Sequence, residues 1–193
     1  MFHLGQFLTY TTVTAGTPGP NTIMSMSNAS QKGFKKALPF NFGIWAGFAI
    51  IASVCTLLCS VLAPIIEKIK TPMLIFGAGY MLYLAYKLIR STGNLEAKES
   101  KGDFFAGMVL QFINPKVYIY SIVSMEAYVI PYFNDRPLIL VAFAIFLATN
   151  GFILTLCWAA FGSLFRKLFS KYGRVTNTVM AILLVYCAIS LFK

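Results

Sequence analysis

The sequence has few charged residues and very few acidic ones. Only 11% of its 193 residues are charged, with 6 Asp plus Glu against 16 Lys plus Arg, while 58% are hydrophobic. Soluble domains carry about 25% charged residues, and a chain of this length cannot shield so much apolar side chain from water. Disorder is excluded too, because it requires low hydrophobicity. The composition therefore predicts an integral membrane protein, and the basic excess fits an anionic membrane surface better than nucleic acid.

Several kinds of chemistry lack the residues that they need. The chain has one histidine, His3, and its four cysteines form no Cys-x-x-Cys pair, which argues against a metal or redox centre. A phosphate-binding loop of the Gly-x-x-x-x-Gly-Lys-Ser/Thr type is absent, so ATP hydrolysis is not expected. A membrane-embedded enzyme or thiol-relay protein would need a base to activate Lys116 or a cysteine, and the apolar runs offer no His, Asp or Glu. We therefore expect no cofactor, no metal and no enzymatic activity.

Six apolar runs are candidates for membrane-spanning helices, which need about 20 apolar residues to cross a hydrocarbon core of roughly 30 Å. The runs cover residues 4–30, 37–66, 71–86, 104–125, 137–165 and 175–192. The third is short, but the lysines that flank it have stems long enough to reach the interfaces. The sequence thus predicts an all-α integral membrane protein with six transmembrane helices.

The basic residues indicate which helix ends are cytoplasmic. Eleven of the sixteen follow the first, third and fifth runs, four lie on the other side, and Lys116 lies inside a run. Because cytoplasmic loops are enriched in Lys and Arg, we expect both termini on the opposite side of the membrane. No signal peptide is visible, so the first run is expected to remain in the protein.

A polar stretch at residues 90–103 divides the runs into three plus three and is expected to be a cytoplasmic linker. Because each half has an odd number of spans, the second half, residues 104–193, enters the membrane inverted relative to the first, residues 1–89. Inverted three-helix repeats of this kind are typical of secondary transporters.

The first helix of each half contains proline in a corresponding place. Residues 17–21 read Thr-Pro-Gly-Pro-Asn, and residues 113–116 read Ile-Asn-Pro-Lys. Proline has no N–H to donate, so the carbonyls of Thr14, Gly16 and Gln111 lose their helical partners. A simple kink is the alternative for either motif alone. Two matched motifs favour broken helices that face each other across a central site.

Broken helices supply binding groups for a zwitterion. A half-helix that begins near Pro20 offers amides and its positive dipole end to a carboxylate, and the unpaired carbonyls are acceptors for an ammonium group. For Asn41 and Asn150 a hydrogen bond between helices is the alternative. The residues expected to line the substrate path are Thr17, Pro18, Gly19, Pro20, Asn21, Asn41, Asn114, Pro115, Lys116 and Asn150.

Lys116 is the only Lys, Arg, His, Asp or Glu inside the six runs. A lysine at the centre of a membrane helix costs about 2.5 to 3.5 kcal/mol on insertion scales, which indicates a function. Three roles remain open: a contact to the substrate carboxylate, a proton-titrating group, or a structural cation bound to freed carbonyls. Coupling through a buried Asp or Glu is not expected.

The two proline motifs, together with Q-K-G-F at residues 31–34, resemble the LysE/RhtB superfamily of amino-acid exporters. Near the C-terminus, Y-G-R at 172–174, Asn177 and L-L-V-Y-C-A at 183–188 resemble its cysteine/O-acetylserine exporter subgroup. The resemblance implies proton-driven export of small neutral amino acids, as an antiporter, across the bacterial inner membrane, by a homodimer. In that membrane, the orientation expected from the basic residues puts both termini in the periplasm. Homoserine or threonine, basic amino acids and a metal ion remain alternative substrates.

Overall fold

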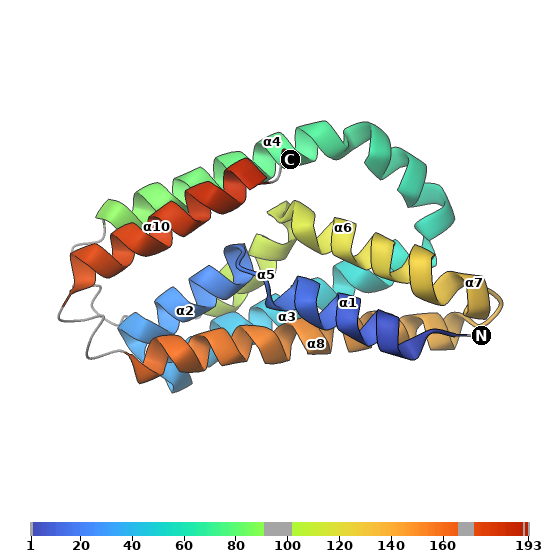
Figure 1. The fold of residues 1–193 in the computed structure, drawn as a ribbon, viewed down its shortest axis with the longest axis horizontal. Helices are drawn as coiled ribbons and strands as arrows, with labels where there is room; N and C mark the ends of the chain where they lie inside the picture. Colours follow the sequence, from blue (N-terminus) through green and yellow to red (C-terminus); the bar gives the residue numbers. More distant parts are fainter. Residues whose placement is uncertain (1, 91–101, 166–171, 191, 193) are drawn as a thin grey trace.

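The computed structural model describes residues 2–90, 102–165, 172–190 and 192, and every regular element in these ranges is helical (Figure 1). This confirms the predicted all-α class. Most of the expected linker, residues 91–101, lies outside the described residues. The helices are α1 (Leu4–Gly16), α2 (Pro20–Lys32), α3 (Phe34–Leu57), α4 (Cys59–Arg90), α5 (Gly102–Ile113), α6 (Pro115–Ser124), a π-helical turn η1 (Met125–Val129), α7 (Ile130–Phe133), α8 (Pro137–Leu164) and α10 (Gly173–Ser190).

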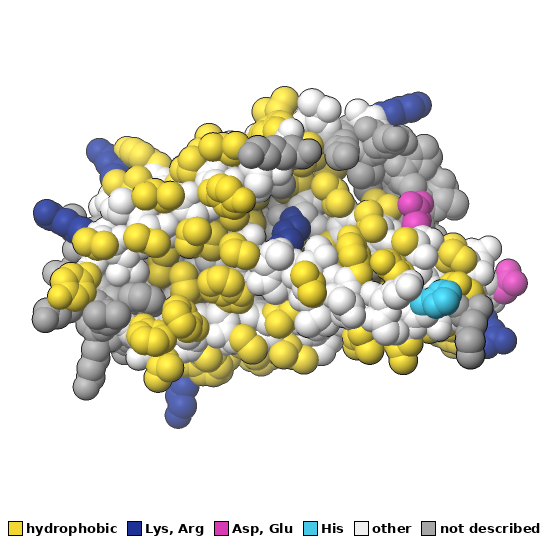
Figure 2. All heavy atoms as spheres, viewed as in Figure 1, with side chains coloured by type: hydrophobic (Ala, Val, Ile, Leu, Met, Phe, Trp, Pro, Cys, Tyr) yellow, Lys and Arg dark blue, Asp and Glu magenta, His cyan; other side chains and the backbone are white. Residues whose placement is uncertain are grey.

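Within the described ranges, four helical segments are long and apolar enough to cross a membrane. They are Phe34–Leu57, Thr71–Arg90, Pro137–Leu164 and Gly173–Ser190. The other two expected runs are each built from two shorter helices in succession, α1 with α2 and α5 with α6. Large apolar side chains such as Phe76 and Leu138 are exposed on these helices, and hydrophobic side chains cover much of the face in Figure 2. The surface is therefore one that fits a lipid environment, while the six-span inverted repeat stays a prediction.

The boundary between the second and third expected runs lies elsewhere than predicted. The chain leaves α3 at Leu57, and α4 continues as a helix of 32 residues through Lys68 and Lys70 to Arg90. The predicted separation of two membrane-spanning runs at residues 67–70 is wrong, because these residues lie inside α4. The ends of the predicted runs are placed at charged residues. Residues 57–66 carry no charge, so nothing in the charge pattern marks the turn at Leu58.

Helices of the two sequence halves are interleaved. Among the most extensive contacts are those of α3 with α5 and α8, and that of α2 with α8. The α4 and α10 helices run side by side along one edge of the molecule (Figure 1). Every one of these pairs joins a helix of the first half to a helix of the second, so the core of the protein lies between the halves.

Glycines bring α3 and α5 into backbone contact. A Cβ atom placed on Gly43 would collide with the carbonyl oxygen of Phe104, and one on Gly107 would collide with that of Phe40. A Cβ on Gly47 would lie 2.7 Å from the Met108 carbonyl oxygen. Small residues of this kind allow membrane helices to approach closely. This crossing fixes α5, and the break that follows it, against the first half of the chain.

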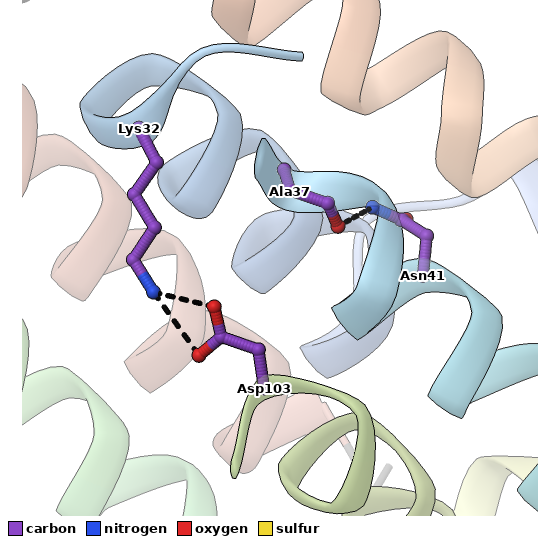
Figure 3. A network of polar contacts seen from close by, with 4 residues as sticks. All are labelled: Lys32, Ala37, Asn41 and Asp103. Carbon is purple, nitrogen blue, oxygen red and sulfur yellow. Dashed lines mark hydrogen bonds and ion pairs between the residues drawn. The ribbon is translucent and has the colours of Figure 1, made fainter. Parts of the chain in front are cut away.

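An ion pair lies at one end of the helix bundle. The Lys32 ammonium lies 2.8 and 3.1 Å from the two carboxylate oxygens of Asp103, and both side chains are largely buried (Figure 3). Lys32 ends α2 and Asp103 lies in the first turn of α5, so the pair joins the two halves. This is the end at which the expected cytoplasmic residues Lys32 and Lys35 lie.

Candidate substrate site

The first helix of the first half is broken where its prolines predict. The α1 helix ends at Gly16, and Thr17 and Gly19 have extended backbone angles before α2 begins at Pro20. The Thr22 hydroxyl stabilises the start of α2, because it accepts a hydrogen bond from the Gly19 N–H at 2.9 Å and donates one to the Gly19 carbonyl at 3.1 Å. Proline is well suited to the first position of a helix, where no N–H is needed.

The matching break in the second half has the same construction. The α5 helix ends at Ile113, Asn114 is extended, and α6 begins at Pro115. The side-chain oxygen of Asn114 caps α6 by accepting a hydrogen bond from the Lys116 N–H at 3.1 Å. Two proline-initiated helix N-termini therefore occur at corresponding places in the halves.

The three freed carbonyls are not open acceptors, contrary to the sequence-based expectation. The Thr14 carbonyl accepts a hydrogen bond from the Thr17 hydroxyl at 2.7 Å, and the Gly16 carbonyl accepts one from the Trp158 indole at 3.2 Å. The Gln111 carbonyl accepts one from the Asn114 N–H at 3.2 Å. Polar groups of the chain satisfy each carbonyl, as burial in a membrane protein demands.

Lys116 reaches from the second break to the first. Its ammonium donates to the hydroxyl of Thr17 at 2.8 Å and to the carbonyl of Thr17 at 3.1 Å. Gly19 leaves room for this approach, because a Cβ there would lie only 3.4 Å from the ammonium nitrogen. The lysine thus binds a carbonyl at the break, although not one of the three freed carbonyls, and it also lines the cavity described below.

An amide cluster joins the two breaks. Asn21 and Gln111 exchange a pair of hydrogen bonds of 2.8 and 3.0 Å, and the Asn114 amide donates to the Asn21 side-chain oxygen at 3.2 Å. Sequence reasoning used only the carbonyl of Gln111 and missed its fully buried side chain. The signal available was an uncharged polar residue one helical turn before Pro115.

A small cavity of about 30 Å³ lies between the breaks. This volume accommodates only one or two water molecules. Six of the predicted residues line it: Thr17, Gly19, Pro20, Asn21, Asn114 and Lys116. Sequence reasoning missed its other lining residues, which are Ala15, Thr22, Phe48, Val117, Tyr120, Gly151 and Thr155.

The other four predicted residues have different environments. The Pro18 carbonyl lies 3.6 Å from the Cys187 sulfur, and Pro115 packs against Gly77, where a Cβ would lie 2.5 Å from the proline ring. The buried Asn41 amide donates to the Ala37 carbonyl (Figure 3) and accepts a hydrogen bond from the Ser25 hydroxyl, which ties α3 to α2. Asn150 lies 3.5 Å from the Thr12 hydroxyl and links α8 to α1. Both asparagines therefore form hydrogen bonds between helices.

The polar end of the cavity is positively charged. It contains the Lys116 ammonium and the first turn of α2, whose amides at Asn21 and Thr22 have no acceptor within the helix. The helix dipole adds partial positive charge at the same place. None of the lining residues is acidic. The arrangement is suited to an anionic group such as a carboxylate.

Comparison with known proteins shows which family the chain belongs to. Residues 12–193 match the family described as LysE type translocator. The chain belongs to the LysE type translocator family. It is 36% identical to the cysteine/O-acetylserine efflux protein of Escherichia coli strain K12 over 98% of this chain and 97% of that protein. The proteins of the same name from Shigella sonnei and Shigella flexneri show the same identity and coverage. No solved structure matches. Family membership and the apolar helices together identify a multi-pass membrane protein.

Proposed function

We propose that this LysE-type translocator exports small neutral amino acids of the cysteine and O-acetylserine class across the bacterial inner membrane. The observation that carries the proposal is the cavity between the two breaks, where the Lys116 ammonium and the α2 N-terminus meet without an acidic neighbour. The names of the relatives, which cover nearly the whole chain, support the same substrate class.

The contacts of Lys116 suggest how a zwitterion is bound. In the structure the ammonium is bonded to Thr17. A substrate carboxylate that approaches the first turn of α2 takes the ammonium as its partner, because a hydrogen bond between two oppositely charged groups is stronger than one from the ammonium to a neutral oxygen. The Thr17 carbonyl then becomes free to accept a hydrogen bond from the substrate ammonium. When Lys116 exchanges Thr17 for the substrate carboxylate, both the carboxylate and the ammonium group of the substrate therefore gain a partner.

Binding requires the site to widen. Ligand pockets usually have volumes of about 300 to 1,000 Å³, whereas this cavity measures about 30 Å³. The α3–α5 crossing holds helices of the two halves together by backbone contact, which opposes rocking of residues 1–89 against residues 104–193 as whole units. We infer that the helix breaks, where backbone hydrogen bonding is interrupted, supply the movement.

A transport assay tests the proposal. Purified protein in liposomes with an imposed pH gradient is supplied with labelled cysteine and O-acetylserine, and uptake is compared between wild type, Lys116→Ala and the matched control Lys87→Ala, an exposed lysine of α4. Loss of a hydrogen bond to a charged group costs about 1.5 to 3 kcal/mol, so Lys116→Ala should reduce transport about 10- to 150-fold, and Lys87→Ala should transport normally.

Two results would contradict the proposal in different ways. If the wild-type protein moves no amino acid, the export function is wrong. If Lys116→Ala is folded and transports at the wild-type rate, the lysine is structural and the binding scheme is wrong.

The remaining features of the proposal concern energy, assembly and orientation. We propose that protons drive export by antiport and that Lys116 is the titrating group, since none of the cavity-lining residues is acidic. Collapse of the pH gradient by an uncoupler should then abolish accumulation. We further propose a homodimer in lipid with both termini in the periplasm, which light scattering in detergent and the labelling of terminal tags would test.

A further inference from the structure

The residues that line the cavity include a mainly apolar group, here called the apolar end, that differs chemically from the group around Lys116. Here the walls are Phe48 of α3, Val117 and Tyr120 of α6, and Gly151 and Thr155 of α8, all of which are buried. The Thr155 hydroxyl is already bonded to the Gly151 and Phe152 carbonyls of its own helix, at 2.9 and 2.8 Å. This end is therefore largely apolar and offers few free polar groups.

Tyr120 of the apolar end lies about one turn of α6 beyond Lys116. Lys116 and Tyr120 are four residues apart on this helix, which corresponds to about 6 Å along its axis. A substrate whose carboxylate lies at Lys116 has its side chain directed along this turn, toward the apolar end. The distance matches an amino acid with a short side chain.

The Phe48 ring is held firmly as the wall of this end. It packs against the Tyr120 ring in a T-shaped arrangement, with centroids 5.7 Å apart and planes at 72°. Tyr120 is fixed in turn, because its hydroxyl donates to the Thr11 carbonyl at 3.2 Å and its ring stacks on Tyr10. A Cβ atom on Gly151 would lie 2.8 Å from one carbon of the Phe48 ring and 3.3 Å from another. The ring occupies the space that a side chain at 151 would fill.

We propose that Phe48, seated on Gly151 and braced by Tyr120, is the residue that limits the size of the transported side chain. It admits the short side chains of the cysteine and O-acetylserine class and excludes longer aliphatic and aromatic ones. The inference rests on the proposed amino-acid export and adds a residue that determines its selectivity.

Two substitutions change the space that Phe48 leaves for the substrate side chain, one increasing it and one decreasing it. Phe48→Leu shortens it and should admit larger substrates such as leucine and methionine. Gly151→Ala pushes the ring into the cavity and should select against O-acetylserine relative to the smaller cysteine. A methylene in an apolar pocket changes discrimination about 10- to 200-fold, so each ratio of transport rates should shift by at least about tenfold.

The chain offers a matched control on the same two helices. Phe42 of α3 packs against Phe152 of α8 with ring centroids 5.2 Å apart, but Phe42 is exposed and outside the cavity. Phe42→Leu makes the same chemical change to the same helix pair, and its selectivity should equal that of wild type.

The experiment measures uptake of labelled cysteine, O-acetylserine, methionine and leucine into liposomes that contain each variant. Ratios between substrates are compared, because they do not depend on how much of each variant is folded. If wild type transports cysteine and O-acetylserine but both wall variants keep the wild-type ratios, the proposed role of Phe48 is overturned and export still holds. If wild type transports none of them, the export function itself fails. If Phe48→Leu does not fold, Phe48→Met takes its place and the same ratio decides.

Discussion

Replacing Gly43 by alanine should destabilise the protein because this glycine touches the backbone of α5. The added Cβ would collide with the Phe104 carbonyl oxygen and would lie 2.8 Å from its carbon and 3.0 Å from the Met108 nitrogen. All of these are main-chain atoms, which cannot rotate away as a side chain can. The two helices would have to separate, and overpacking of this kind costs about 1 to 3 kcal/mol.

Alanine also has an opposing effect, because it favours helix over glycine by about 1 kcal/mol. Gly79 of α4 measures this effect alone, since a Cβ there would meet nothing within 4 Å. We therefore expect Gly43→Ala to lose about 2 kcal/mol of unfolding free energy if the overlap lies at the upper end of the range. We expect Gly79→Ala to be neutral or to gain up to about 1 kcal/mol.

The assay is denaturant unfolding in detergent followed by tryptophan fluorescence, for which Trp45 of α3 is a local reporter. Equal unfolding free energies for the two variants would show that α3 and α5 are not in backbone contact, and would refute the reasoning. The site is expected to respond as well. A Cβ at the neighbouring Gly47 would lie 3.0 Å from the Gln111 side chain, which holds Asn21 at the start of α2. Separation of the helices should therefore reduce transport by Gly43→Ala.

Other substitutions test the remaining polar contacts. Gln111→Leu should destabilise the protein by about 1 to 3 kcal/mol, because it removes two hydrogen bonds of Asn21 at a buried position; an unchanged thermal midpoint would contradict the amide cluster. Asp103→Lys alone should lower stability by up to about 1 kcal/mol and Lys32→Asp with Asp103→Lys should restore it, whereas a double variant no better than the single one would show that the pair contributes nothing. Tags at the two termini should react with an impermeant reagent on intact spheroplasts, and reaction only after lysis would reverse the orientation.

The helix breaks were predictable because each is marked by a local combination of residues. Pro18, Pro20 and Pro115 lack an N–H, and in each break an asparagine stands directly beside a proline. Pro39 of α3 and Pro72 of α4 lack an N–H as well but lie inside helices, so a proline alone does not break a helix in this protein. The turn at Leu58 was not predictable in this way. It lies in an uncharged stretch, six residues before Pro64, and neither a charge nor an adjacent proline or glycine marks it.

Half of the site was predictable and half was not. Lys116 stands out because the surrounding runs contain no other charge. Its partner Thr17 is 99 positions away along the chain, and Trp158, which satisfies the Gly16 carbonyl, is 142 positions from its acceptor. Phe48 and Gly151 look like any aromatic residue and any glycine of an apolar helix until their contact is seen.

The sequence by itself determined that the chain folds in lipid, where its first helices break, and which ionisable residue lies within an apolar run. The tertiary structure decided that the two breaks meet, that the freed carbonyls are already bonded, and that the cavity between them has a cationic end and an apolar end. The reason is that the preference for lipid over water depends on composition, and the interruption of a helix depends on the chemistry of neighbouring residues. In a soluble protein, the polar face of a helix marks the side that contacts water. Lipid is as apolar as the protein core. The pattern of apolar residues in a membrane helix therefore does not show which side packs against another helix and which side contacts lipid.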